Sequence, residues 1–196
     1  MRRVSVVGNS GSGKSWLAAR LAARLGVPYI ELDAVFHLPN WTELPADEFR
    51  RQVADLTATG GWVVDGNYLN GRDVVWGRAD TVVWVDPPRA LVTFRVVSRS
   101  LGRVLRRREL WNGNREHWRN LLSTDPAKSI IAWSWTQHQA YRDRYSATMT
   151  DPAWANLTFI RLRSASDREK LLSSVGLQPG ADPKDADRNR FDDGSR

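Results

Sequence analysis

The stretch GNSGSGKSW, residues 8–16, decides how the rest of the chain is interpreted. Gly8, Gly13, Lys14 and Ser15 fit the pattern G-x-x-x-x-G-K-[ST], whose glycines let successive backbone N–H groups converge on a phosphate. A short apolar run ends at Gly8 and leucines spaced four apart follow Ser15, which is the strand–loop–helix setting that the motif needs. The N-terminus of that helix adds a partial positive charge at the same point. The stretch therefore predicts a cradle for a nucleoside triphosphate.

The loop predicts the nucleotide contacts and part of a metal site. Lys14 is expected to bridge the β- and γ-phosphates of ATP, and the Ser15 hydroxyl is expected to ligate Mg²⁺. A flexible glycine-rich turn is the alternative, and a dinucleotide-binding fingerprint is excluded because Trp16 stands where its third glycine belongs. The expected nucleotide-binding residues are Gly8, Asn9, Ser10, Gly11, Ser12, Gly13, Lys14, Ser15 and Trp16.

Apolar runs and helical repeats alternate along the chain, which predicts an α/β fold with a parallel sheet. Five strands are expected, at residues 2–8, 27–32, 61–65, 80–86 and 157–162. Helices are expected at residues 14–26, 45–60 and 166–176. The last of these is predicted to open with a capping box formed by Ser166 and Glu169.

Residues 87–145 are predicted to be mostly helical, with apolar side chains on one face and arginines on another. Asn112 and Gly113 interrupt the pattern with a turn signal. The apolar face before this turn is formed by Leu91, Phe94, Val97, Leu101 and Val104. A further helix follows the turn, and its apolar stripe is formed by Ile131, Trp135, His138 and Tyr145.

Size and composition are those of one globular domain with a hydrophobic core. The chain has 196 residues, of which 41% are hydrophobic and 26% are charged. We expect the domain to span residues 1–176, and residues 177–196 to form a disordered tail because they contain little that could be buried. There is no cysteine, so disulfides and thiolate metal sites are excluded.

Neither a membrane partner nor export is expected. No apolar run approaches the ~20 residues of a membrane helix. The apolar run near the N-terminus, residues 4–7, is too short for the core of a signal peptide. We therefore predict a cytoplasmic protein.

The positive charge of the chain is concentrated in one stretch. The net charge is +7, and six arginines without an intervening acid, at residues 95–108, account for all but one of the excess charges. Such a patch is expected to face an anion such as nucleotide phosphates, nucleic acid or an acidic surface. The alternative is a solvated helix face. The six residues are Arg95, Arg99, Arg103, Arg106, Arg107 and Arg108.

Carboxylates follow two of the predicted strands. In a parallel sheet, ligands bind beyond the carboxyl ends of the strands, which is where Asp33 and Asp65 fall. Asp65 is suited to hold Mg²⁺ through water, and Asp33 to orient the hydroxyl of a phosphate acceptor. Glu31 lies two residues before Asp33, so both side chains point the same way if the strand continues.

Structural roles remain as alternatives at these positions. Asp65 could cap a turn, and Asp33 could cap the segment that follows it. His37, His117 and His138 have no metal-ligand spacing, so we expect them to be structural or at the surface. The ten tryptophans are expected mainly in the core.

Four segments carry a resemblance to a known family. They are VVGNSGSGKS, ELDAVFHLPNW, WVVDGNY and RELWNGNRE, in that order. With them, residues 1–176 resemble the adenylate-kinase-like P-loop kinases, and more closely the bacterial branch labelled "DNA topology modulation protein". The resemblance implies a three-layer fold, with helices on both faces of a five-stranded parallel sheet and an arginine-rich helical lid.

The resemblance also assigns roles to individual residues. Asp65 matches an aspartate that lies near Mg²⁺, while Glu31 and Asp33 match paired acids on the metal side and the acceptor side. The loop at residues 164–166 is expected near the adenine. A lid at about residues 95–122 is expected to supply catalytic arginines, namely Arg99, Arg103, Arg107 and Arg115.

Three departures from the adenylate kinase pattern stand out. After Asp65-Gly66 the chain continues with Asn67 and Tyr68, and the next arginine is Arg72. No arginine between residues 34 and 44 matches the one that those kinases use for AMP. Trp16 replaces a threonine that commonly touches the α-phosphate.

These observations favour a Mg²⁺–ATP-dependent kinase that acts on a small molecule or nucleotide, with Lys14, Asp33 and Asp65 at its centre. A nucleotide-dependent DNA-binding or regulatory protein is the first alternative, because the arginine stretch could contact a phosphate backbone. A slow ATP-binding switch without an acceptor is the second.

Overall fold

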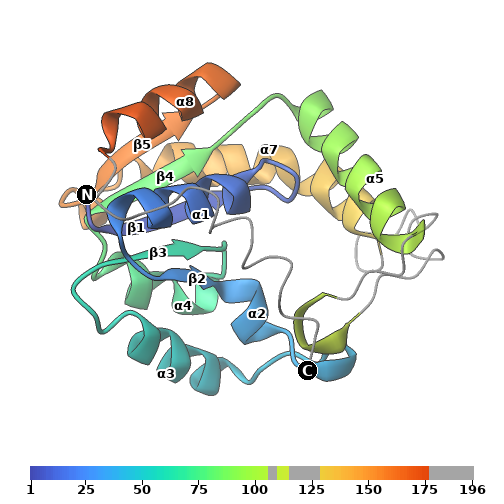
Figure 1. Cartoon of the computed structure of the whole chain (residues 1–196), viewed down its shortest axis with the longest axis horizontal. Coiled ribbons are helices and arrows are strands. Elements are labelled where there is room, and N and C mark those ends of the chain that lie inside the picture. The colour runs from blue at the N-terminus through green and yellow to red at the C-terminus, as the bar shows by residue number, and fades with distance from the viewer. Residues whose placement is uncertain (106–109, 115–128, 177–196) are drawn as a thin grey trace.

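The computed structural model describes residues 1–105, 110–114 and 129–176, and it confirms the five-stranded parallel sheet. The strand order is β2-β3-β1-β4-β5, so the strand that leads into the glycine-rich loop lies in the middle (Figure 1). The strands are β1 (Arg3–Gly8), β2 (Tyr29–Glu31), β3 (Trp62–Asp65), β4 (Thr81–Val85) and β5 (Thr158–Leu162).

Helices connect these strands. The α-helices are α1 (Lys14–Leu25), α2 (Leu32–Phe36), α3 (Ala46–Leu56), α4 (Leu69–Trp76), α5 (Arg89–Leu105), α7 (Ile130–Thr148) and α8 (Ala165–Ser174). Short 3₁₀ turns occur at η1 (Pro39–Trp41), η2 (Trp111–Gly113) and η3 (Pro152–Trp154). Helix α4 was not expected, because Asn70 and Gly71 resemble a turn. The buried Gly71 leaves room for the ring of Phe49, since a Cβ there would lie only 3.0 Å from Phe49 Cε1.

Both faces of the sheet are covered, because successive side chains of a strand point to opposite faces. On one face, Val4, Val6 and Val63 pack with the leucines of α1 and α8. On the other face, Val64 and Trp84 pack with side chains of α3, α4 and α7. The predicted three-layer arrangement is therefore present, and the tryptophans of β3, α4 and β4 lie in its core.

Strand β2 ends earlier than the sequence suggests. The chain becomes helical at Leu32, so Asp33 lies on α2 rather than on the strand with Glu31. The condition under which the two acids would point the same way is not met. Glu31 instead pairs in register with Asp65 across β2 and β3, which sends these two side chains to the same face of the sheet.

The predicted apolar face of α5 is wrong. Leu91, Phe94 and Leu101 are exposed, Phe94 by 68%, while the helix buries Val92 and Val96. The helix carries two apolar stripes, and the one with the smaller side chains approaches the glycine-rich loop most closely.

Two further details of the sequence prediction are wrong. The capping box of α8 is formed by Ser164 and Asp167, two residues earlier than expected, and each side chain accepts the backbone N–H of the other residue. Trp135 on α7 is 48% exposed rather than part of a buried stripe, whereas His138 and Tyr145 are buried as expected.

The carboxyl ends of the strands lie at one edge of the sheet, and α2, α5 and residues 110–114 lie beyond this edge (Figure 1). In the described ranges, no helix is both long enough and apolar enough to cross a bilayer. The predicted tail, residues 177–196, and most of the predicted lid beyond Leu105 lie outside the described residues. The cytoplasmic location stays a prediction.

Candidate active site

The glycine-rich loop has the backbone that its sequence predicts. Gly11 and Gly13 adopt left-handed conformations, with φ of 82° and 92°. A Cβ on Gly11 would lie 2.5 Å from Val96 Cγ2, so only glycine lets α5 approach the loop this closely. No side chain caps the N-terminus of α1 at Gly13, which leaves the first N–H groups of that helix available to a ligand.

Polar side chains from distant parts of the chain hold the loop in place. Asn67, just after β3, accepts a hydrogen bond from Gly8 N (2.9 Å) and donates one to Gly8 O. From α7, Ser134 O accepts a bond from Asn9 Nδ2 (2.8 Å), and Ser134 Oγ donates to Ser10 O (3.1 Å). The loop is therefore shaped before any ligand binds. Ser134 carries no sequence signal that would have revealed this contact.

Asp65 ends β3 beside the loop, and its side chain is buried. Its Oδ2 accepts a hydrogen bond from the Tyr29 hydroxyl (3.2 Å), whereas Oδ1 has no partner among the described residues. Burial raises the pKa of this carboxyl, while the nearby Lys14 charge and a Ser15 hydrogen bond lower it in part. Asp65 thus brings a buried, incompletely satisfied oxygen to the first residues of α1.

Asp33 reaches the same region from α2. Its Oδ1 accepts a hydrogen bond from the Tyr68 hydroxyl at 2.7 Å, and its charge contributes to raising the pKa of Asp65. Burial and the Asp33 charge raise the pKa of Tyr68, so this hydroxyl stays a donor at neutral pH. Asp33 is therefore held on one oxygen, which leaves the other oxygen to accept a further proton donor.

Aromatic rings surround this polar pair. Tyr68 packs against Phe36, with ring centroids 4.5 Å apart, and its hydroxyl lies 3.4 Å from His37 Nε2. The ring of His37 stacks with that of Trp111 and meets the edge of Trp41. The sequence indicated no role for His37 beyond structure. The fold places it next to the partner of Asp33.

Residues 110–114, predicted as part of the lid, contact the segment after α2. Asn114 Oδ1 accepts a bond from Trp41 N (2.8 Å), and Asn114 Nδ2 donates to Leu38 O (2.9 Å). Asn112 Nδ2 donates to the carbonyl oxygen of His37. Three non-glycine residues of the described chain have positive φ, and all three lie at this junction. They are Asn40, Trp41 and Asn112.

The residues at the loop fit a magnesium ion. Mg²⁺ prefers oxygen ligands and is commonly held by one or two protein groups together with phosphate oxygens and waters. The Ser15 hydroxyl and the orphaned Oδ1 of Asp65 supply such a pair, and Glu31 pairs in register with Asp65. In the part of the chain that the structure describes, no cluster of three acidic, histidine or cysteine side chains competes for a metal.

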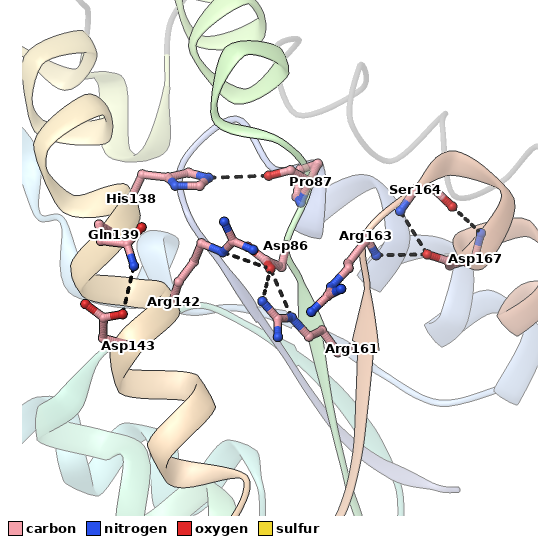
Figure 2. Close-up of polar contacts among 10 residues, drawn as sticks. All are labelled: Asp86, Pro87, His138, Gln139, Arg142, Asp143, Arg161, Arg163, Ser164 and Asp167. Atoms are coloured by element: carbon pink, nitrogen blue, oxygen red, sulfur yellow. Dashed lines mark hydrogen bonds and ion pairs between the residues drawn. The ribbon is translucent and has the colours of Figure 1, made fainter.

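A second buried aspartate at this edge of the sheet is already neutralised. Asp86 follows β4, and its Oδ2 accepts a bond from Arg161 Nε (3.0 Å) and faces Arg142 Nε (3.3 Å), as Figure 2 shows. Nearby, His138 on α7 contacts the carbonyl oxygen of Pro87. Asp86 therefore joins β4, β5 and α7, and the ion pairs make it a poor metal ligand.

Two of the predicted arginine positions can be placed at the loop. Arg99 Nη2 donates to Ser10 Oγ (2.8 Å), and Arg95 Nη1 donates to Ser12 O (3.2 Å). Arg103 lies on α5, but its side chain is outside the described part of the structure. Arg107 and Arg115 are also outside the described residues.

The chain has the fold of the P-loop kinases. It is similar to a shikimate kinase from Acinetobacter baumannii in complex with shikimate, with 14% sequence identity, 89% of this chain and 90% of that chain covered, and a TM-score of 0.54. The shikimate kinase from Bacteroides thetaiotaomicron also has 14% identity, with 88% of this chain and 95% of that chain covered and a TM-score of 0.52. At this identity the likeness shows the fold alone.

No protein-family model matches the chain. A search of curated proteins also found no match. The resemblance to P-loop kinases is therefore supported by structure, whereas the bacterial branch inferred from the four sequence segments stays a prediction.

Proposed function

We propose that the chain is a Mg²⁺–ATP-dependent phosphotransferase that acts on a hydroxyl-bearing small molecule. One observation carries the proposal: the buried carboxylate of Asp65 presents an unpartnered oxygen beside Lys14 and Ser15, at the start of an uncapped helix. A buried carboxylate without a partner is costly in an empty protein, and a bound cation removes that cost. A purely structural loop would have no need for this arrangement.

Each group has a defined role in the proposed reaction. Lys14 and the loop N–H groups bind the β- and γ-phosphates, and Ser15 and Asp65 hold the metal. A bound magnesium ion would neutralise the charge of the phosphates. Asp33 orients the acceptor hydroxyl and accepts its proton as the oxygen attacks the γ-phosphorus, while ADP leaves with the bond to its bridging oxygen.

Arginines of α5 supply the remaining positive charge. Arg95 and Arg99 already contact loop residues, so little movement is needed to bring them to a phosphate. Preorganised donors of this kind stabilise the charge of the transition state. The predicted roles of Arg103, Arg107 and Arg115 extend this proposal to the lid.

The surroundings of Asp33 guide the choice of acceptor. The described groups nearest to it are the Tyr68 hydroxyl and aromatic rings, and no arginine between residues 34 and 44 could hold a nucleotide monophosphate. We therefore favour a small hydroxyl compound over AMP as the acceptor. The acceptor is expected to bind between α2 and residues 110–114.

A DNA-binding protein of the topology-modulation type is the competing proposal. Arg95 and Arg99 hydrogen-bond to the loop, which favours a role at the nucleotide. Binding to duplex DNA, titrated against salt, separates the two ideas. Several phosphate contacts would give a steep loss of affinity with rising salt, and a shallow or absent response favours the kinase.

The direct test uses γ-labelled ATP, Mg²⁺ and a mixture of metabolites, followed by identification of the labelled product. Lys14→Ala is expected to abolish transfer without unfolding the protein, because Lys14 is needed only at the phosphates. Lys170→Ala, on the exposed side of α8, is the matched control and should transfer normally. Normal transfer by the Lys14 variant would show that the roles are assigned wrongly. ATP binding without any product would indicate the slow-switch alternative.

A further inference from the structure

Trp16 has surroundings that the phosphate-binding motif does not require. It is the third residue of α1, and its ring packs against the core shared by α1 and α8. Two guanidinium groups lie over the ring: the Cζ of Arg20 is 4.1 Å from the ring centroid, and the Cζ of Arg168 is 5.6 Å from it. Arg20 comes from the same helix, whereas Arg168 reaches Trp16 from α8.

Arg168 also reaches the loop itself. Its Nη1 lies 2.8 Å from the point where a Cβ on Gly13 would be, and Arg95 Nη1 lies 3.6 Å from the same point. Gly13 thus lets two guanidinium groups, from α8 and α5, come together against the backbone that precedes Lys14. Neither arginine was expected from the glycine-rich motif, and Arg168 lies outside the predicted lid.

The charge of Arg168 has no carboxylate to balance it directly. Within the described ranges, Arg168 forms no ion pair, and its contact is with the Trp16 ring. Burial and the charge of Arg95 lower its pKa, and only the charge of Glu169 acts in the other direction. A cation–π contact positions a guanidinium without using its N–H donors or cancelling its charge. These donors therefore remain available to an anion.

The sheet order shows which end of the nucleotide this is. Asp65 and the acceptor side lie on β3 and α2, to one side of β1, whereas α8 follows β5 at the opposite edge. The γ-phosphate must lie toward the acceptor. A phosphate near Gly13 and Arg168 is therefore one of those nearer to the nucleoside.

We propose that Arg168 binds the nucleotide phosphates at the end of the loop remote from Asp65, and that Trp16 is the residue that positions it. The inference rests on the proposed function. It also gives a physical reason for Trp16 at a position where a hydroxyl side chain is common: the ring orients a charged donor from another helix in place of the missing hydroxyl.

Calorimetric titration with MgATP tests the contact. Arg168→Gln is expected to weaken MgATP binding about tenfold to a hundredfold, as for a charge-assisted hydrogen bond, and Arg168→Lys to recover part of the loss. Arg20→Gln removes the other guanidinium over Trp16 and is the matched control, with unchanged affinity. Magnesium tripolyphosphate should show the same pattern, because the proposed contact is with phosphate. Circular dichroism checks that each variant is folded.

A double-mutant cycle tests the positioning role. Trp16→Leu keeps an apolar side chain in the core and should weaken MgATP binding, but it should have no further effect when Arg168 is already Gln. The inference is overturned if Arg168→Gln binds MgATP as the wild type does, if Arg20→Gln loses as much, if the loss is absent with tripolyphosphate, or if the two substitutions are additive. A wild-type chain that binds no MgATP overturns the proposed function as well.

Discussion

Asp65 and Asp86 are buried aspartates that end the two strands flanking β1, and we predict opposite effects when each is changed to asparagine. Asp86 is paired with Arg161 and Arg142, whereas Asp65 accepts only a 3.2 Å bond from Tyr29 and has an orphaned Oδ1. Without ligand, Asp65→Asn removes a buried charge that nothing neutralises fully. Asp86→Asn removes a charge that two arginines need.

The magnitudes follow from these contacts. An unsatisfied buried polar group costs about 1–3 kcal/mol, and more when it is charged, so Asp65→Asn should stabilise the ligand-free protein by roughly 1–3 kcal/mol at pH 7. This corresponds to a rise in melting temperature of about 2–4 °C for each kcal/mol in a chain of this size. Asp86→Asn should cost about 1.5–3 kcal/mol, because Arg142 and Arg161 are partly exposed and lose only charged hydrogen bonds.

Thermal unfolding with and without MgATP is the assay. At a ligand concentration of about a hundred times Kd, binding stabilises the wild-type protein by roughly 2.7 kcal/mol. The Asp65→Asn variant should gain much less from MgATP, since its amide is a poor magnesium ligand. The variant is thus expected to melt above the wild type without ligand and to lose this advantage when MgATP is present.

The pH dependence gives an independent check. The folded-state pKa of Asp65 is raised above its ordinary value of about 3.9, so the fold favours the protonated carboxyl. Stability is therefore lost as the pH rises from the unfolded-state pKa through the folded-state pKa. The advantage of Asp65→Asn should be small near pH 4 and should grow toward neutral pH. A variant that melts below the wild type at pH 7 without ligand would refute the reasoning.

Three further predictions concern the loop and the acceptor side. Gly11→Ala should lower the melting temperature, because a left-handed alanine costs about 1–2 kcal/mol and its Cβ would collide with α5, whereas Gly102→Ala on α5, where a Cβ meets nothing, should raise it by up to about 1 kcal/mol in stability. Tyr68→Phe should reduce phosphotransfer about tenfold and leave the calorimetric affinity for MgATP unchanged, since only the bond to Asp33 is lost. Asn114→Ala should raise the acceptor KM without affecting MgATP binding, because its two bonds hold residues 110–114 against the acceptor side; an equal loss of nucleotide affinity would contradict this.

The sequence predicted the centre of the fold well because the signals there are local. The glycines of residues 8–16 demand particular backbone conformations, and the four-residue spacing of leucines after them is a property of one helix. Asp65 ends a fully apolar run, so its place at the edge of the sheet follows from strand length alone. The same local logic found all five strands.

Local patterns failed where two answers were equally good. Helix α5 has an apolar stripe with Leu91 and Phe94 and another with Val92 and Val96, and the periodicity supports both. The second stripe is buried because Gly11 leaves room for a small side chain such as Val96. Similarly, Ser164 with Asp167 and Ser166 with Glu169 are both acceptable capping boxes, and only the actual end of β5 selects the first.

By itself, the sequence determined that the chain has a phosphate cradle between a buried strand and a helix, with an aspartate at the end of a later strand. Only the tertiary structure decided what stands around that cradle: Tyr68 on Asp33, Asn114 on Trp41, and Arg168 with Arg95 at Gly13. These contacts join residues that are tens of positions or more apart in the chain. Their pairing depends on sheet order and helix packing, which no local pattern of residues encodes.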